Sequence, residues 1–252
     1  MGNDQIQHNK EAWQHRSYEF FLNRYGTPVE EAKRIKQDPN YAIRLHSDYL
    51  PPLSGLKIAN PCGSHGRIAT ALAVLGADVT VFDISEENQK YATELASQAG
   101  VSLNYVVGDF CSLDKDRYTG FFDLVLAELG IMHYFHEIDL FSQTVSSLLH
   151  DSGRFVLADF HPFRKLQANS ITNGNYFDSQ VHMGPVPYQK FFSEEEQVSF
   201  PQCLLRIYTI GEIINSLIQA NLMIEKFDEH PDWDNSEIPG WYHLQAIKTS
   251  RL

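Results

Sequence analysis

The stretch from Leu56 to Asp109 decides the fold of this chain, and it reads LKIANPCGSHGRIATALAVLGADVTVFDISEENQKYATELASQAGVSLNYVVGD. A short apolar strand leads into the turn Pro61-Cys62-Gly63-Ser64-His65-Gly66, and an apolar helix is predicted to open over 65–68. A second strand then ends in Asp83, and a third leads into Gly108-Asp109. A strand, a glycine turn, a helix and a strand ending in a carboxylate begin a nucleoside-binding α/β unit.

Each part of this unit has a predicted task. Gly63 and Gly66 let the turn approach a ligand where a Cβ would collide, although alone they fit an ordinary strand-to-helix turn equally well. Asp83 is expected to accept hydrogen bonds from both hydroxyls of a ribose. Asp109 is expected to reach the exocyclic amine of an adenine, with Phe110 packed on the ring. The ordered set favours a ligand, and the second carboxylate indicates S-adenosylmethionine.

On these residues the chain resembles class I S-adenosylmethionine-dependent methyltransferases, closely from about 56 to 162 and more loosely to the C-terminus. Their first motif aligns to 58–66, with Asn60 in place of the usual acidic residue. The variant Asn-x-x-Gly-Ser-x-Gly is similar to a bacterial subgroup of small-molecule methyltransferases, as are 128–135 and 159–162. The resemblance implies S-adenosylmethionine as cofactor, S-adenosylhomocysteine as product, and a Rossmann-like seven-stranded sheet of order 3-2-1-4-5-7-6 with the last strand antiparallel.

The turn, the strand ends and the resemblance together predict a set of cofactor-binding residues. They are Asn60, Gly63, Ser64, His65, Gly66, Asp83, Ile84, Asp109, Phe110, Glu128 and Leu129. Asn60 would hold the methionine amine through a neutral amide instead of a charge. For His65, contact with the cofactor carboxylate and exposure to solvent are equally open.

Strands and helices alternate from residue 55 onward, which predicts a parallel sheet with helices on both faces. The predicted strands are 56–60, 78–83, 102–107, 121–127, 153–160, 222–228 and 242–248, and the predicted helices are 65–75, 86–99, 136–149 and 210–220. We expect residues 1–53 to form a helical cap segment, with one aromatic-rich helix up to a break at Gly26 and a second begun by Thr27-Pro28. Residues 54–252 then form the methyltransferase domain.

Residues 163–208 interrupt this alternation. They contain turn residues (Asn169-Ser170 and Asn173-Gly174-Asn175) followed by aromatic, strand-like pieces at 188–192, 197–200 and 204–208. A stretch of this length is unusual as a structureless loop. We interpret it as a β-rich, lid-like insertion on the substrate side, with a dimer contact as the alternative.

The fourth predicted strand ends at Glu128, so 128–134 lie at the sheet edge where ligands bind in open α/β sheets. His133 is the first candidate for a general base, because an ordinary histidine pKa of about 6.5 suits proton abstraction near neutrality. An orienting role in the loop is an equally good interpretation. His161, at the tip of the fifth strand, is a second base candidate or holds its loop by a hydrogen bond. The predicted substrate-binding residues are Tyr18, Tyr134, His182 and Tyr188.

Composition excludes several classes of function. With 20 basic and 32 acidic residues the net charge is −12, and no Lys/Arg cluster marks a nucleic-acid surface. The three cysteines are scattered, so we expect neither disulfides nor a metal site. The polar N-terminus and the absence of a long apolar run predict a cytoplasmic protein, without a membrane partner, that acts as a monomer or homodimer.

The sequence therefore predicts transfer of a methyl group from S-adenosylmethionine to an N or O atom of a small-molecule acceptor, by direct in-line displacement. A non-catalytic S-adenosylmethionine-binding or regulatory protein is one alternative. An NAD-dependent oxidoreductase is another, which the missing Gly-x-Gly-x-x-Gly pattern disfavours.

Overall fold

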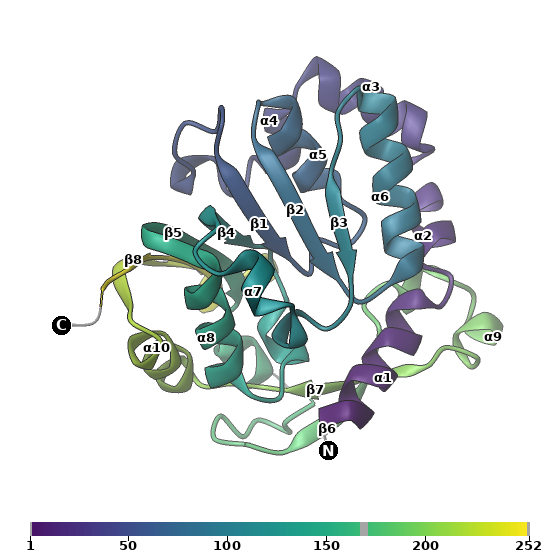
Figure 1. Cartoon of the computed structure of the whole chain (residues 1–252). Helices are drawn as coiled ribbons and strands as arrows, with labels where there is room; N and C mark the ends of the chain where they lie inside the picture. Colours follow the sequence, from purple (N-terminus) through teal and green to yellow (C-terminus); the bar gives the residue numbers. More distant parts are fainter. Residues whose placement is uncertain (1, 167–170, 251–252) are drawn as a thin grey trace. The chain divides into compact units, whose positions relative to one another are not determined.

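The computed structural model describes residues 2–166 and 171–250, whose elements fall into two compact units (Figure 1). The first comprises the chain up to Leu113 together with Pro185–Cys203. The second comprises Asp114–Gly184 and the chain from Leu204 onward. Asn169 and Ser170, two of the expected turn residues, lie outside the described residues.

The seven strands of the main sheet have the order β3-β2-β1-β4-β5-β9-β8. Their bounds are Lys57–Pro61 (β1), Asp78–Asp83 (β2), Asn104–Val107 (β3), Phe122–Ala127 (β4), Leu149–Phe160 (β5), Leu222–Pro231 (β8) and Pro239–Lys248 (β9). The strand β9 is antiparallel to both β5 and β8, while β1–β2, β2–β3 and β4–β5 are parallel pairs. When the seven strands of this sheet are numbered along the chain, β8 is the sixth and β9 the seventh. The predicted order 3-2-1-4-5-7-6 and the predicted antiparallel last strand are therefore confirmed.

The first unit joins β1, β2 and β3 to helices that pack against one another beside them (Figure 1). These helices are α1 (Gly2–Gln14), α2 (Ser17–Tyr25), α3 (Pro28–Gln37), α4 (Asn40–Ile43), α5 (Arg67–Val74) and α6 (Glu86–Ala99). The start of α3 follows the predicted capping chemistry, since the Thr27 side chain and Glu30 form a reciprocal capping box ahead of Pro28. Buried β-branched and aromatic residues such as Val79, Val81 and Phe82 fix β2 in the core.

The expectation of one aromatic-rich helix up to Gly26 is wrong. The chain breaks at Arg16, which has a left-handed backbone (φ 56°), and α1 and α2 are therefore separate helices. Both helices contact α6. On α1, Lys10 pairs with Glu86 (2.7 Å) and the carbonyl oxygen of Trp13 accepts a hydrogen bond from the Ser85 hydroxyl (3.0 Å).

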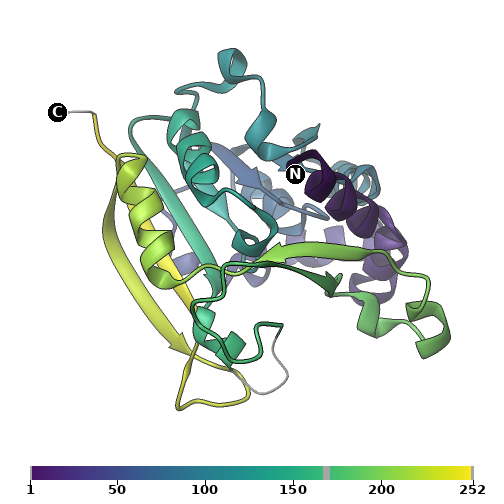
Figure 2. The same cartoon turned by 90° about the horizontal axis from the view of Figure 1, so that it is seen from below.

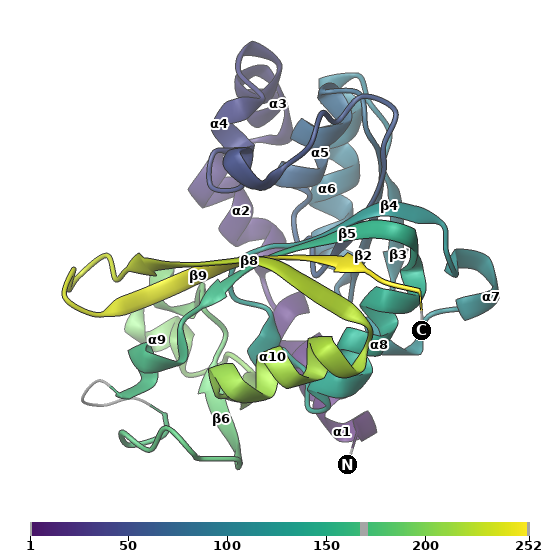
Figure 3. The same cartoon turned by 90° about the vertical axis from the view of Figure 1, so that its left-hand side faces the viewer.

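The second unit contains β4, β5, β8 and β9 with α7 (Lys115–Tyr118), α8 (Ile138–Leu148) and α10 (Ile210–Gln219). The helix α10 packs against α8 and β8 (Figures 2 and 3), and the Ser142 and Ser216 hydroxyls are hydrogen-bonded where the two helices meet (2.9 Å). A capping box between Thr209 and Glu212 starts α10. The β8–β9 hairpin is longer than expected, with β8 running on to Pro231.

The insertion contains less strand than the sequence predicted. Its strands β6 (Val181–Pro185) and β7 (Gln202–Arg206) form a separate two-stranded sheet (Figure 2). The piece expected as a strand at 188–192 instead contains the 3-10 turn Gln189–Phe191. The next expected strand-like piece, 197–200, begins at the last residue of the helix α9 (Glu194–Gln197). The physical reason is local: Ser193 and Glu196 form a capping box, which begins a helix. The lid-like role of the insertion stays a prediction.

Candidate functional site

The turn after β1 depends on Cys62 and Ser64 as well as on the two expected glycines. Cys62 and Ser64 have left-handed backbones (φ 52° and 48°), as does Gly66 (φ 68°), and α5 begins only at Arg67. A Cβ at Gly63 would lie 2.2 Å from the Oδ1 atom of Asn60, and one at Gly66 would lie 2.6 Å from the Cβ of Ala92. Both glycines are therefore required by close packing inside the protein. Asn60 is itself fully buried beneath the turn.

Asp83 lies at the carboxyl end of β2, as predicted, and is only 6% exposed. One carboxylate oxygen accepts hydrogen bonds from the backbone amide of Ser85 and the side-chain amide of Asn88, and the other accepts from the amide of Ser64, each at 3.0 Å. Burial raises the pKa of Asp83, and these hydrogen bonds act against that rise. Two carboxylate oxygens offer about four lone pairs, so contact with both ribose hydroxyls requires some of these donors to move.

The tip of β3 has open space beside it. A Cβ at Gly108 would meet no atom within 4 Å, and the amide of Gly108 donates to the carbonyl oxygen of Asp83 (2.8 Å). The next residue, Asp109, accepts hydrogen bonds from the Cys111 amide and the Ser112 hydroxyl (3.2 and 2.6 Å). The ends of β2 and β3 thus each carry a carboxylate that is oriented by hydrogen bonds from its own neighbourhood.

Phe110 was expected to pack on the adenine ring, and this stays a prediction. Its side chain is buried (4% exposed), and its ring packs edge-on against Phe82 at a centroid distance of 5.9 Å. Ile84 and Ser64, the other predicted cofactor residues of this unit, are half-buried. The carbonyl oxygen of Ser64 accepts a hydrogen bond from the Tyr105 hydroxyl (2.6 Å), which ties the turn to β3.

His65 packs its ring nearly parallel to those of Phe21 and Tyr25, at centroid distances of 4.5 and 4.7 Å. Both of its ring nitrogens are shielded from solvent and have no hydrogen-bond partner among the described residues. Burial, aided by the nearby Arg67 cation, lowers the pKa of His65 to about 3. The two ring nitrogens are thus not the exposed groups of the alternative, although the residue as a whole is half-buried, and contact with a cofactor carboxylate stays a prediction.

Two predicted substrate residues lie at the α1–α2 junction, in the first unit. The Tyr188 ring is buried and stacks on Phe20 (5.1 Å), and its hydroxyl lies within hydrogen-bond distance of the carbonyl oxygens of Ala12 and His15 (2.8 and 2.7 Å). The Tyr18 hydroxyl donates to Glu94 at 2.5 Å. Both hydroxyls thus have partners inside the protein, and a substrate role for either would compete with these bonds.

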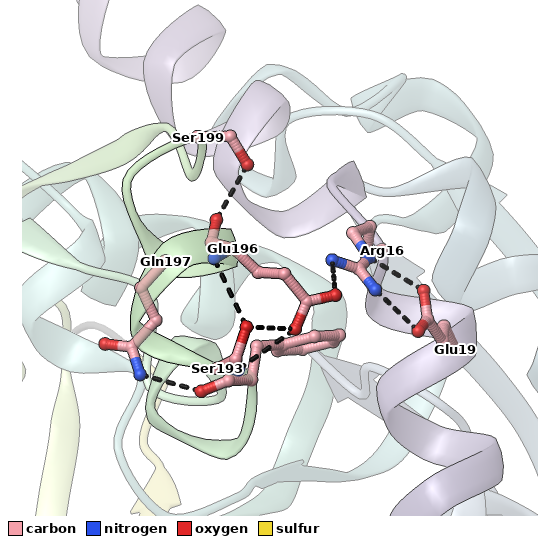
Figure 4. Close-up of polar contacts among 7 residues, drawn as sticks. Arg16, Glu19, Ser193, Glu196, Gln197 and Ser199 are labelled. Atoms are coloured by element: carbon pink, nitrogen blue, oxygen red, sulfur yellow. Dashed lines mark hydrogen bonds and ion pairs between the residues drawn. The ribbon is translucent and has the colours of Figure 1, made fainter.

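An ion-pair network fastens the same junction to the insertion (Figure 4). Arg16 pairs with Glu19 (2.7 Å) and with Glu196 (2.8 Å), and its guanidinium lies 4.3 Å from the ring centroid of Phe192. Glu196 also accepts from the amide and hydroxyl of Ser193, the start of α9. The segment 188–200 therefore packs on the N-terminal helices within one unit.

In the second unit, the loop after β4 is held by a buried carboxylate. Asp159 on β5 accepts hydrogen bonds through one oxygen from the backbone amides of Ile131 and Met132 (3.1 and 2.7 Å). Gly130 has a left-handed backbone (φ 88°), and a Cβ there would lie 2.7 Å from the Phe160 ring. Asp159 thus positions the loop that carries the predicted residues, of which Glu128, Leu129, His133 and Tyr134 are half-buried.

His161 is buried with both ring nitrogens engaged. Its Nδ1 accepts a hydrogen bond from the Phe163 amide (3.1 Å), so its Nε2 carries the proton that faces Glu229 (3.0 Å). Burial lowers the pKa of His161, and Glu229 opposes this. The arrangement favours a loop-holding role for His161 over a role as general base. His182, in the insertion, pairs with Asp178 (2.9 Å).

His133 borders a small cavity of about 20 Å³, which is room for one water-sized group. The cavity is lined by Met132, His133, Asp159, Phe160, Pro162, Tyr208, Ile213 and Tyr242. Sequence reasoning missed Asp159 and Tyr242. The register pairs these two residues on β5 and β9, which could be found only by knowing that distant strands are neighbours.

The described residues, 2–166 and 171–250, contain no group of three or more His, Cys, Asp or Glu side chains arranged to hold a metal ion. No helix in these ranges is both long and apolar enough to cross a membrane.

Comparison with known proteins shows similarity to methyltransferases. Residues 61–157 match a family model described as a methyltransferase domain. A ubiquinone biosynthesis O-methyltransferase from Methylocella silvestris is 29% identical over 59% of this chain and 57% of its own length. The chain thus spans less than two thirds of that relative.

Two solved structures share the fold. A magnesium protoporphyrin IX methyltransferase from Synechocystis PCC 6803 with bound SAH is 17% identical (98% of this chain, 100% of that chain, TM-score 0.61). An S-adenosylmethionine-dependent methyltransferase from Mesorhizobium loti is 20% identical (84% of this chain, 99% of that chain, TM-score 0.62). A model of the methyltransferase domain thus matches residues 61–157, and the chain has the fold of S-adenosylmethionine-dependent methyltransferases.

Proposed function

We propose that this protein transfers a methyl group from S-adenosylmethionine to an oxygen atom of a small organic acceptor. The observation that carries the proposal is the placement of Asp83 and Asp109 at consecutive strand ends beside the left-handed turn, within the segment matched by the methyltransferase model. Oxygen is favoured over nitrogen because the curated relative cited above is an O-methyltransferase.

Each unit carries residues with a proposed role. In the first, Asp83 and Asp109 would accept hydrogen bonds from the nucleoside, beside the open space at Gly108. Bound cofactor would supply an electrophilic methyl group on a sulfonium, so the protein need only orient the acceptor and receive a proton. In the second, His133 would take that proton from the acceptor hydroxyl, on a loop held by Asp159.

Calorimetric titration of the purified protein with S-adenosylmethionine and S-adenosylhomocysteine tests the cofactor site. We expect Asp83→Asn to weaken binding of both strongly, because an amide cannot replace a carboxylate that accepts on both oxygens. Asp78→Asn is the matched control, since Asp78 is exposed at the opposite end of the same strand. Equal effects of the two variants, or no binding by the folded wild type, would contradict the proposal.

A screen for S-adenosylhomocysteine formation with small phenols, alcohols and amines tests the acceptor chemistry. Methylated oxygen products, with a turnover that falls in His133→Asn while cofactor affinity is kept, are expected. Methylated amines only would refute the assignment of an oxygen acceptor. Cofactor binding without any turnover would support the non-catalytic alternative.

The remaining expectations are part of the same proposal. We propose a cytoplasmic enzyme that works on a small molecule as a monomer or homodimer, without a nucleic-acid substrate. The support is compositional: the net charge of −12 opposes binding to a phosphate backbone.

A further inference from the structure

Tyr242 stands out among the residues that line the cavity beside His133. Its side chain is fully buried, between the stacked ring of Phe227 (5.1 Å) and the edge-on ring of His161 (6.2 Å). Its hydroxyl is also buried and has no hydrogen-bond partner among the described residues. A buried hydroxyl without a hydrogen-bond partner is unfavourable. A ligand with an oxygen atom in this cavity would remove that cost by accepting a hydrogen bond from Tyr242.

The chemistry of the lining limits what this guest can be. Asp159 faces Tyr242 across the β5–β9 register, and its charge adds to burial in raising the pKa of the phenol above its ordinary value. The phenol therefore stays protonated and needs an acceptor, whereas the carboxylate can only accept, and it already accepts from the amides of Ile131 and Met132 on one oxygen and from that of Phe160 on the other (2.6 Å). An anionic guest would be repelled by Asp159, and an ammonium group would offer Tyr242 no lone pair. A neutral hydroxyl satisfies both, because it accepts from one group and donates to the other.

Size and position agree with this chemistry. A volume of about 20 Å³ admits one hydroxyl and excludes a larger polar group such as a carboxamide. The cavity is also bordered by His133, the base in the proposed function, and by Met132, whose amide is held by Asp159. We propose that this cavity is the acceptor's hydroxyl subsite, in which Tyr242 donates a hydrogen bond to the hydroxyl oxygen and Asp159 accepts one from the hydroxyl, while removal of the proton on methyl transfer stays with His133. The proposal rests on the methyl-transfer function only in naming the guest as part of the acceptor.

The subsite can be tested without knowing the acceptor. Protein labelled with 3-fluorotyrosine gives a fluorine resonance for each of the 12 tyrosines, and the one that disappears in Tyr242→Phe belongs to Tyr242. Phenol and toluene are the probes, because they differ only in a hydroxyl against a methyl group. Both are titrated in the presence of S-adenosylhomocysteine, and their binding constants are taken from the shift of the Tyr242 resonance.

In the wild type we expect phenol to shift the Tyr242 resonance and to bind about ten-fold more tightly than toluene. The variant Tyr242→Phe lacks this resonance, so its binding is followed at the other tyrosine resonances, where we expect no preference for phenol. Tyr176→Phe is the control, since the Tyr176 hydroxyl accepts a hydrogen bond from the Ile210 amide and does not line the cavity. It should keep the full preference.

Equal binding of the two probes by the wild type, or a preference for phenol that survives in Tyr242→Phe, would overturn the subsite and leave a cavity that holds only water. A shift with phenol from a protein that forms no S-adenosylhomocysteine with any acceptor would support the subsite and refute the methyl-transfer function. The two ideas can thus fail separately.

Discussion

Replacement of His65 by phenylalanine should make the protein markedly less sensitive to acid. The His65 ring packs on Phe21 and Tyr25, and neither ring nitrogen has a hydrogen-bond partner among the described residues, so a phenylalanine ring can take its place. Burial lowers its pKa from 6.5 to about 3 in the folded protein. Below pH 6.5 the unfolded chain therefore binds a proton that the folded protein does not bind.

The sign and the size follow from proton linkage. The pKa of His65 is lower in the folded protein than in the unfolded chain. Protonation of His65 therefore does not reduce the free energy of unfolding above pH 6.5, and it reduces it progressively as the pH falls from 6.5 towards 3. Between pH 7.5 and pH 5 the loss is about 2 kcal/mol in the free energy of unfolding, since each pH unit below 6.5 contributes about 1.36 kcal/mol. Burial also lowers the pKa of His46, to about 4, and the resulting loss of stability is the same in the wild type and in His65→Phe.

Urea unfolding at the two pH values measures this difference. We expect the wild type to lose about 2 kcal/mol more than His65→Phe between pH 7.5 and pH 5. His8→Gln is the control, because His8 is partly exposed on α1 and should change nothing. If wild type and His65→Phe lose the same free energy, His65 titrates as in water and its burial is not as described.

Three further substitutions test the packing around the site. Glu31→Ala should lower the free energy of unfolding by about 3 to 5 kcal/mol, because the fully buried Glu31 carboxylate pairs with Arg67 (2.5 Å) and its loss leaves that cation uncompensated; thermal and urea unfolding measure it, and a loss below about 1 kcal/mol would contradict a buried pair. Gly63→Ala should cost about 1 to 3 kcal/mol through collision with Asn60, and the cost should shrink in an Asn60→Ala background; equal costs in the two backgrounds would refute that contact. Tyr188→Phe should cost about 1 to 3 kcal/mol and speed proteolysis of 188–200, since it removes the hydrogen bond to the α1–α2 junction; an unchanged cleavage rate would contradict this role.

The sequence by itself determined the alternation of elements and the placement of Asp83 and Asp109 at strand ends. These depend on local patterns: runs of apolar residues, the Thr27-Pro28 helix start, and acidic residues that follow directly on a strand. The order of the sheet followed from family resemblance, because spacing alone does not say which strands are neighbours. Asn60 and Gly63 were predicted as cofactor-binding residues, which stays a prediction, whereas the need for a glycine at 63 comes from Asn60 packed beneath it.

Only the tertiary structure decided which predicted residues are free to act. His161 is engaged on both ring nitrogens, Tyr188 binds the α1–α2 junction, and Phe110 is buried against Phe82, each through a partner that no local pattern reveals. Tyr242 gave no signal in the sequence, because a tyrosine in a strand of mixed polar and apolar residues is typical of any sheet. Its meaning depends on the antiparallel register that sets it opposite Asp159, and on the absence of a partner for its hydroxyl among the described residues. Such pairings are fixed by packing between distant segments, which only the folded chain brings together.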